Sequence, residues 1–153
     1  MKFRIALLTV FFTLTTGLNA SFAQENLVEG FWLTQNERSV VETFKCNEGL
    51  CGKIHWIIEG GMTSDSENPD VSLRNRPLCN LGILWGFSQN PNNPNVWEGG
   101  KIYKADDGDT YSATLSVKDA NTLFVRGYVG LPIFGKSQTW TRVSPANYPA
   151  CGV

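Results

Sequence analysis

The glycine-rich segment near the C-terminus matches a nucleotide-binding pattern. Residues 130–137, G-L-P-I-F-G-K-S, fit G-x-x-x-x-G-K-[ST], in which backbone N–H groups and a lysine hold phosphates. Such a loop must open a helix, because the helix N-terminus contributes to phosphate binding. Here residues 138–142 alternate as in a β-strand, and Pro132 removes one backbone donor. We therefore interpret the segment as a glycine-hinged connection between two strands and predict no cofactor.

His55 and a group of oxygen-bearing side chains are further candidates for chemistry. His55 is the only histidine, which excludes two-histidine metal sites, although a single histidine can act as a base. Asp65, Asn68 and Asp70 offer oxygen ligands that suit calcium, but their spacing is not that of an EF-hand. Asx residues beside a proline are first a turn-forming device. We predict turns here and no metal site.

Arg126 carries an anion-binding group in an aromatic setting. Phe124, Arg126 and Tyr128 share one face of a predicted strand whose other face is apolar. A guanidinium flanked by rings can bind a carboxylate while its aliphatic stem stays covered. This face lies either outside the fold or along a cavity. Pairing of Arg126 with an acidic neighbour is the alternative.

The N-terminus has the features of a secretory signal peptide. Lys2 and Arg4 precede an apolar stretch at residues 5–14, and Ser21-Phe22-Ala23 is a small-x-small cleavage site. The stretch is shorter than the roughly 20 residues that span a bilayer. We predict cleavage near Ala23, with Ala20 as the competing site. The mature protein, residues 24–153, is then a single domain in the periplasm or outside the cell.

Charge and length limit the partners of this domain. The chain has 153 residues and a formal net charge of -1, with 13 basic and 14 acidic side chains. This balance argues against an electrostatically driven binder of nucleic acid or anionic membranes, since both need clustered Lys and Arg. We expect a monomer without stable membrane insertion.

Four cysteines in an exported chain indicate disulfide bonds. Cys46 and Cys51 flank four residues between two predicted strands, so a four-residue hairpin loop would place them opposite each other. Cys79 is then left for Cys151. A zinc ion held by four thiolates is the alternative, but only one of the paired ligand spacings is present.

Period-2 apolar patterns predict an all-β fold. In residues 109–118, Tyr111, Ala113, Leu115 and Val117 alternate with polar side chains. Residues 89–95 are predicted to be a solvated turn, and the long polar segment 59–77 is functional or disordered. Eight short antiparallel strands close into an up-and-down barrel or stack as a sandwich. The predicted strands are residues 31–34, 40–46, 51–58, 81–87, 96–103, 109–117, 122–129 and 138–143.

Closure of a barrel would join the first and last strands. Trp32 lies on the first strand and Arg142 on the last, so the seam brings a tryptophan and an arginine together. We assign this pair a structural role.

Motifs spread over most of the chain resemble one known family. They are, in chain order, C-G-K-I at 51–54, D-x-x-N-P-D at 65–70, L-R-x-R-P-L at 73–78, G-G-x-I-Y at 99–103, G-x-x-Y at 108–111, L-x-V-R-G-Y at 123–128 and G-x-P-x-x-G-x-x-Q-T-W-T-R at 130–142. Together they resemble a bacterial secreted family, domain of unknown function 2147. The resemblance implies a lipocalin-like antiparallel barrel in an exported protein and no established reaction. Asn80 and Lys104-Ala105 depart from the family pattern, which puts local turn geometry in doubt.

Small eight-stranded barrels are filled by side chains or hold one small ligand. Our leading hypothesis is a barrel that binds a small amphipathic or anionic molecule. An envelope interaction module is one alternative, and an enzyme with a polar pocket around Arg126 is another, less favoured one. The candidate ligand-binding residues are Trp56, Arg74, Arg76, Tyr103, Tyr111, Arg126 and Trp140.

Overall fold

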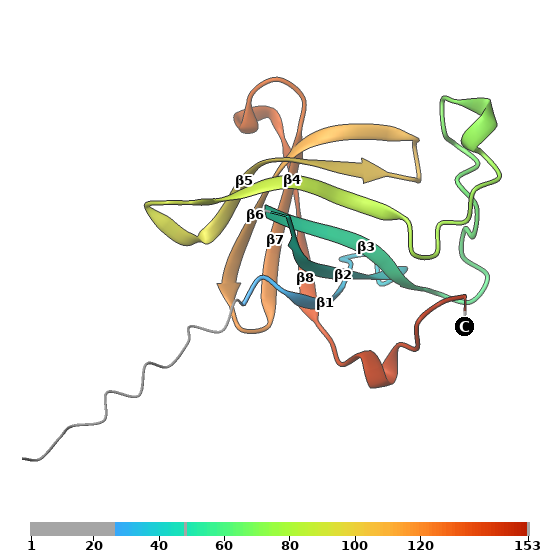
Figure 1. Cartoon of the computed structure of the whole chain (residues 1–153), viewed down its shortest axis with the longest axis horizontal. Coiled ribbons are helices and arrows are strands. Elements are labelled where there is room, and N and C mark those ends of the chain that lie inside the picture. The colour runs from blue at the N-terminus through green and yellow to red at the C-terminus, as the bar shows by residue number, and fades with distance from the viewer. Residues whose placement is uncertain (1–26, 48, 153) are drawn as a thin grey trace, which may run out of the picture.

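A closed β-barrel forms the body of the protein. The structure is a computed structural model that describes residues 27–47 and 49–152, so the predicted signal peptide at 1–23 lies outside the described residues. Eight strands pair antiparallel in chain order, and β1 pairs with β8 to close the barrel (Figure 1). The eight-stranded antiparallel barrel predicted from the sequence is thereby confirmed, and the alternative sandwich is not formed. The strands are β1 Gly30–Leu33, β2 Ser39–Cys46, β3 Gly49–Ile57, β4 Gly82–Asn90, β5 Asn93–Lys104, β6 Asp109–Asp119, β7 Thr122–Tyr128 and β8 Lys136–Arg142.

Helical structure is limited to three single turns of 3-10 helix among the described residues. These are η1 Val71–Leu73, η2 Pro132–Phe134 and η3 Pro145–Asn147. None of the helices in this part of the chain is long and apolar enough to cross a membrane.

The apolar core lies inside the barrel and follows from strand alternation. Ala113, Leu115 and Val117 of β6 are buried, while the residues between them are more exposed. Leu123 and Val125 of β7 bury the matching face. Successive side chains of a strand point to opposite faces, so the period-2 pattern of the sequence predicts which residues lie inside.

One end of the barrel is closed by Trp32 and Arg142. The Arg142 guanidinium lies 4.1 Å above the Trp32 ring, and Trp32 Nε1 donates to Val28 O at 3.1 Å and to Thr43 Oγ1 at 3.0 Å. Gly30, at φ +139°, passes directly under the guanidinium, where a Cβ would overlap Arg142. The seam expected between the first and last strands is therefore present, and it needs glycine at position 30.

Both predicted disulfides are present, but the first lies in a different register from the one expected. β2 continues to Cys46, which pairs with Gly49, and Cys51 lies opposite Phe44. Cys46 and Cys51 are thus diagonal neighbours on one face, with their Cα atoms 5.8 Å apart. The prediction of a four-residue loop was wrong, because β3 begins at Gly49, two residues before Cys51, and the strand pairing continues into the turn.

The β4–β5 hairpin also continues further than the sequence indicates. Residues 89–95 are not a plain turn, because β4 runs to Asn90 and β5 begins at Asn93. Gln89 pairs with Trp97 across this extension, and the Asn90 side chain caps the turn at the N–H of Asn92. Asn side chains mimic a backbone turn in this way, so the asparagine-rich segment still forms a ladder.

Two segments outside the strands are tied to each other. The long β3–β4 connection, residues 58–81, and the C-terminal tail are joined by the Cys79–Cys151 disulfide, with Cα atoms 5.7 Å apart. The tail runs along the outer face of β3, where Cys151 N donates to His55 O. Figure 1 shows the connection as a long excursion beside the barrel, away from the η2 loop.

Candidate functional site

A cavity of about 500 Å³ opens at the end of the barrel opposite Trp32. This volume lies within the range of small-molecule sites in proteins. Its walls are mainly apolar, and its mouth is formed by the β1–β2, β3–β4, β5–β6 and β7–β8 connections. The apolar side chains of the walls are Ile54, Ile57, Met62, Leu78, Ile83, Ile102, Val125 and Trp140.

Gly127 on β7 helps to keep the interior open. It shares the inner face with Leu123 and Val125, and it lines the cavity. A Cβ added there would make only ordinary contacts, 3.6 Å to Tyr111 Cβ and 3.7 Å to Ile102 Cγ2. A larger side chain at this position would therefore extend into space that is now empty.

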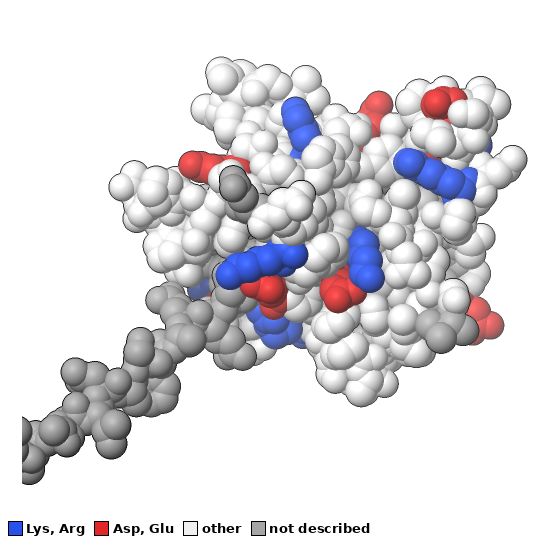
Figure 2. Space-filling model, viewed as in Figure 1, with Lys and Arg blue, Asp and Glu red and all other residues white. Residues whose placement is uncertain are grey.

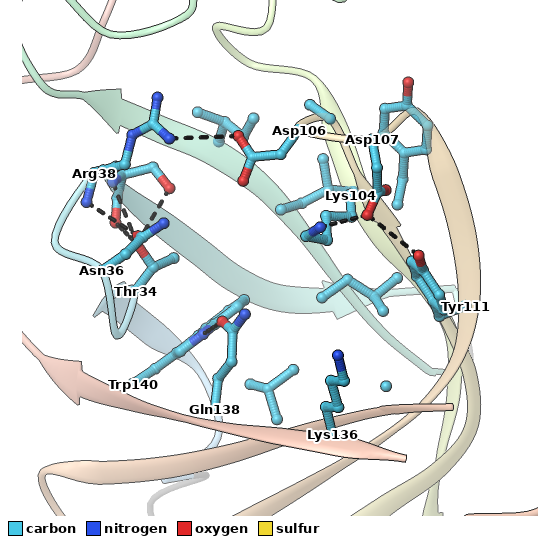
Figure 3. A pocket seen from close by; sticks show the side chains of 18 of the residues that line it. Thr34, Asn36, Arg38, Lys104, Asp106, Asp107, Tyr111, Lys136, Gln138 and Trp140 are labelled. Atoms are coloured by element: carbon cyan, nitrogen blue, oxygen red, sulfur yellow. Dashed lines mark hydrogen bonds and ion pairs between the residues drawn. The ribbon is translucent and has the colours of Figure 1, made fainter. Parts of the chain in front are cut away.

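The inner face of β8 carries the polar groups of the cavity. Lys136, Gln138 and Trp140 alternate along this strand and all line the cavity (Figure 3). Gln138 Oε1 accepts a hydrogen bond of 2.9 Å from Trp140 Nε1, which leaves the Gln138 amide nitrogen as a donor. Among the described residues, no carboxylate pairs with Lys136. An unpaired cation beside an amide donor is suited to an anionic head group.

Opposite β8, a second polar group occupies the β5–β6 side of the mouth. Asp107 accepts hydrogen bonds from Lys104 and from Tyr111 Oη, the latter at 3.2 Å. Burial acts to raise the pKa of Asp107, but the bonds from Lys104 and Asp109 N outweigh it and lower the pKa. The bond to Asp107 in turn raises the pKa of Lys104. The two charges compensate each other, so Lys136 dominates the charge of the inner wall.

An ion pair joins two sides of the mouth. Arg38 of the β1–β2 loop lies 3.7 Å from Asp106 of the β5–β6 turn, and both line the cavity (Figure 3). These connections belong to opposite sides of the barrel in strand order. Both side chains are about half exposed, so the pair contributes little to stability.

Asp65 anchors the β3–β4 connection to the barrel. It is fully buried, and it accepts hydrogen bonds from Tyr103 Oη at 2.5 Å, from Asn68 Nδ2 at 2.7 Å and from Arg76 Nε at 2.7 Å. Burial acts to raise the pKa of Asp65, but these bonds and the Arg76 charge lower it overall. Because its carboxylate oxygens accept from Tyr103 on β5 and from Asn68 and Arg76 in the connection, Asp65 holds the connection against β5.

Three of the seven residues proposed as ligand-binding line this cavity, namely Tyr103, Tyr111 and Trp140. The Tyr103 hydroxyl is directed to Asp65 and the Tyr111 hydroxyl to Asp107. Each ring therefore contributes to the cavity mainly as an apolar surface, because its hydroxyl already has a partner.

The other four are held elsewhere, each by a specific partner. Trp56 packs on the outer face against Tyr148 of the C-terminal tail, with ring centroids 4.9 Å apart. Arg74 Nε donates to Asn68 O at 2.7 Å within the connection, and Arg76 binds Asp65. Arg126 lies on the outer face of β7, because the alternation that buries Leu123 and Val125 turns it outward.

Position by itself excludes His55 from the cavity. It lies on the outer face of β3, with Nε2 3.0 Å from Tyr148 O and its ring against Phe31. The alternative of a polar pocket around Arg126 also lacks support, since Arg126 donates to the η2 loop and to Ser137. Asp65 and Tyr103 also lie within hydrogen-bond distance, as an enzyme site would require, but this bond anchors the β3–β4 connection to the barrel.

Lys136 and Gln138 are the polar residues of the inner face of β8 that the sequence reasoning did not assign to a site. The strand expected at 138–143 in fact begins at Lys136. Extending the alternation back from the buried Trp140 would have placed both side chains on the inner face. The interpretation of residues 130–137 as a glycine-hinged connection instead left Lys136 outside the predicted strand.

Comparisons with known proteins agree with this architecture. Residues 30–142 match a family described as "uncharacterized protein conserved in bacteria" (DUF2147). Protein HP1028 from Helicobacter pylori, described as belonging to the lipocalin family, is structurally similar, with a TM-score of 0.67 and 26% sequence identity. The similarity covers 78% of this chain and 84% of the H. pylori protein. No curated protein matches the sequence.

Proposed function

We propose that this chain, which belongs to the DUF2147 family of uncharacterized bacterial proteins and folds as a lipocalin-like barrel, binds a small amphipathic anion in its cavity. The observation that carries the proposal is an open, apolar cavity of about 500 Å³ with one unpaired lysine on its inner wall. An apolar chain fits the walls, and an anionic head group fits Lys136 and the Gln138 amide at the mouth.

The depth of the cavity favours this orientation of the ligand. Below the mouth, the inner face carries Ile54, Ile83 and Val125, which are at most 8% exposed. Transfer of an apolar chain to such walls releases about 25 cal/mol for each Å² removed from water. The head group stays beside Lys136, because burying its charge deeper would cost more than the apolar contacts return.

We also propose that the protein is exported and acts as a monomer in the periplasm or outside the cell. Two disulfides and no free cysteine among the described residues suit an oxidising compartment. The signal peptide at residues 1–23 is the proposed route of export.

A pair of fluorescent probes tests the binding proposal. Anilinonaphthalene sulfonate and N-phenylnaphthylamine share their rings, but only the first is anionic. Lys136→Gln should weaken binding of the anionic probe about three- to tenfold and leave the neutral probe unchanged, since one charge-assisted hydrogen bond is lost. Lys101→Gln, on an exposed lysine that bonds Ser112, is the matched control and should change neither.

Gly127→Leu distinguishes the cavity from other binding surfaces. The added side chain enters the cavity, so both probes should bind at least about tenfold more weakly. Unchanged binding of both probes to this variant would refute the cavity as the site. A native mass spectrum of protein purified from the periplasm should in addition show a bound small molecule.

A further inference from the structure

Four apolar side chains project into solvent beside the cavity mouth. Val129, Leu131, Ile133 and Phe134 are 74%, 63%, 76% and 78% exposed. We call residues 129–134 the mouth tip. Single exposed apolar residues are common on proteins, but a contiguous group of this kind marks an interaction site.

Arg126 fixes the mouth tip to the end of β7. Its guanidinium donates to Pro132 O at 2.8 Å, to Ile133 O at 3.2 Å and to Ser137 Oγ at 2.8 Å. Gly135 lets the segment turn closely over β7, since a Cβ there would lie only 2.7 Å from Gly127 O. The apolar side chains are thus presented in a fixed arrangement, so little entropy remains to be lost when a partner covers them.

The hairpin that carries the mouth tip is basic. Residues 120–144 contain no acidic residue; of their three basic residues, Arg126 and Lys136 belong to the open end and Arg142 to the closed end at Trp32. Arg126 and Lys136 lie at the base of the tip, where β7 and β8 pair. The carboxylates of Asp106 and Asp107 at the mouth are each paired with a cation. In Figure 2 the projection formed by the η2 loop is uncharged, with a basic side chain at its base.

The mouth tip is continuous with the cavity. Val129 and Phe134 line the cavity and are also exposed outside it, so an apolar path leads from the cavity walls to the tip. A ligand with an apolar chain could move along this path without entering water. This continuity favours a lipid surface over a protein as the partner.

The geometry points to docking of the mouth tip on an anionic lipid bilayer. The apolar side chains enter the interfacial region, while Arg126 on the outer face and Lys136 at the cavity mouth bring positive charge close to the anionic head groups. The choice of a lipid partner rests on the proposed binding of an amphipathic ligand. The net charge of -1 argues against binding driven by charge alone, but here apolar insertion supplies the affinity and the basic hairpin sets the orientation.

Vesicle flotation tests this docking with no ligand present. The protein should float with phosphatidylethanolamine–phosphatidylglycerol vesicles and bind phosphatidylcholine vesicles on the order of tenfold more weakly, since each cation near an anionic surface contributes roughly fivefold. Leu131→Ser/Ile133→Ser should reduce binding to the anionic vesicles at least about tenfold, because two apolar anchors are lost. Neither residue lines the cavity.

The matched control removes apolar side chains from another exposed 3-10 turn. Val71 and Leu73 of η1 are 69% and 36% exposed, and Val71→Ser/Leu73→Ser should float like the unchanged protein. Equal flotation of both double variants would overturn the proposal. It would also be overturned by self-association in sedimentation that depends on the mouth tip, without vesicle binding, since a second copy would then be the partner.

Gly127→Leu separates this inference from the proposed function. The variant fills the cavity and leaves the mouth tip unchanged, so it should float normally while losing probe binding. Vesicle binding that is lost in Gly127→Leu, with circular dichroism unchanged, would overturn the assignment of docking to the mouth tip.

Discussion

Replacement of Asp65 by asparagine should loosen the β3–β4 connection from the barrel. The carboxylate accepts hydrogen bonds from Tyr103, Asn68 and Arg76 and is fully buried. In asparagine one carboxylate oxygen is replaced by an NH2 group, which is itself a donor and cannot accept these hydrogen bonds. The substitution also removes the negative charge beside Arg76. Breaking a buried, hydrogen-bonded ion pair typically costs about 3–5 kcal/mol.

The structure places the expected cost at the lower end of this range. Arg76 is about one-third exposed, so its charge can reach water once the partner is gone. Tyr103 and Asn68 are only 7% and 5% exposed, so the donor that faces the new amide nitrogen stays buried without an acceptor. We expect the free energy of unfolding to fall by about 3 kcal/mol.

Urea denaturation and a double-mutant cycle measure this cost. Tyr103→Phe combined with Asp65→Asn should reveal a coupling free energy of about 1–3 kcal/mol between the two residues. A loss below about 1 kcal/mol for Asp65→Asn, or additive effects in the cycle, would contradict the role assigned to Asp65. Hydrogen exchange should localise the loosening to residues 58–81.

The same carboxylate predicts a pH dependence of stability. The pKa of folded Asp65 is lowered from its ordinary value of 3.8, so its contribution is complete above that value and is lost as the pH falls through the folded pKa. Below about pH 4 the unchanged protein should therefore lose stability more steeply than Asp65→Asn does. Parallel slopes in acid titrations of urea midpoints would contradict this.

Two further predictions concern covalent and steric closure of the fold. Cys79→Ala/Cys151→Ala opens a 72-residue loop and should lower the free energy of unfolding by up to about 4 kcal/mol. Urea denaturation of this variant and of the oxidised protein measures the difference. An unchanged urea midpoint would show that the Cys79–Cys151 disulfide does not constrain the unfolded chain. Gly30→Ala should displace Arg142 from Trp32 and cost about 2–4 kcal/mol in thermal unfolding, because a Cβ at φ +139° overlaps the guanidinium. A stable Gly30→Ala variant would show that the closed end tolerates rearrangement.

Local patterns predict much of this fold because strand alternation and cysteine spacing are nearly independent of distant neighbours. The alternation from Tyr111 to Val117 fixes the faces of β6, and the same pattern turns Arg126 outward. The spacing of Cys46 and Cys51 predicts their bond even though the hairpin register differs. Lys136 was placed in a connection because the predicted strand began at residue 138, whereas the alternation continues back from Trp140 to Lys136.

Contacts between distant segments could not be predicted in the same way. The bond between Asp65 and Tyr103 joins residues 38 positions apart, and nothing local to either residue indicates it. The carboxylate seeks donors because burial of an unpaired charge is costly. Which donors it finds depends on how the β3–β4 connection packs on β5.

Three glycines separate what sequence determines from what tertiary structure decides. The sequence alone establishes that Gly52, Gly100 and Gly127 lack side chains on strands of an all-β fold. Packing then fills the space beside Gly100 with the Phe87 ring and the space beside Gly52 with Leu84, while the space beside Gly127 stays open. Whether a barrel holds a cavity depends on side-chain volumes that eight strands bring to the same level, so the sequence determines the strands and only the closed barrel decides whether a cavity remains.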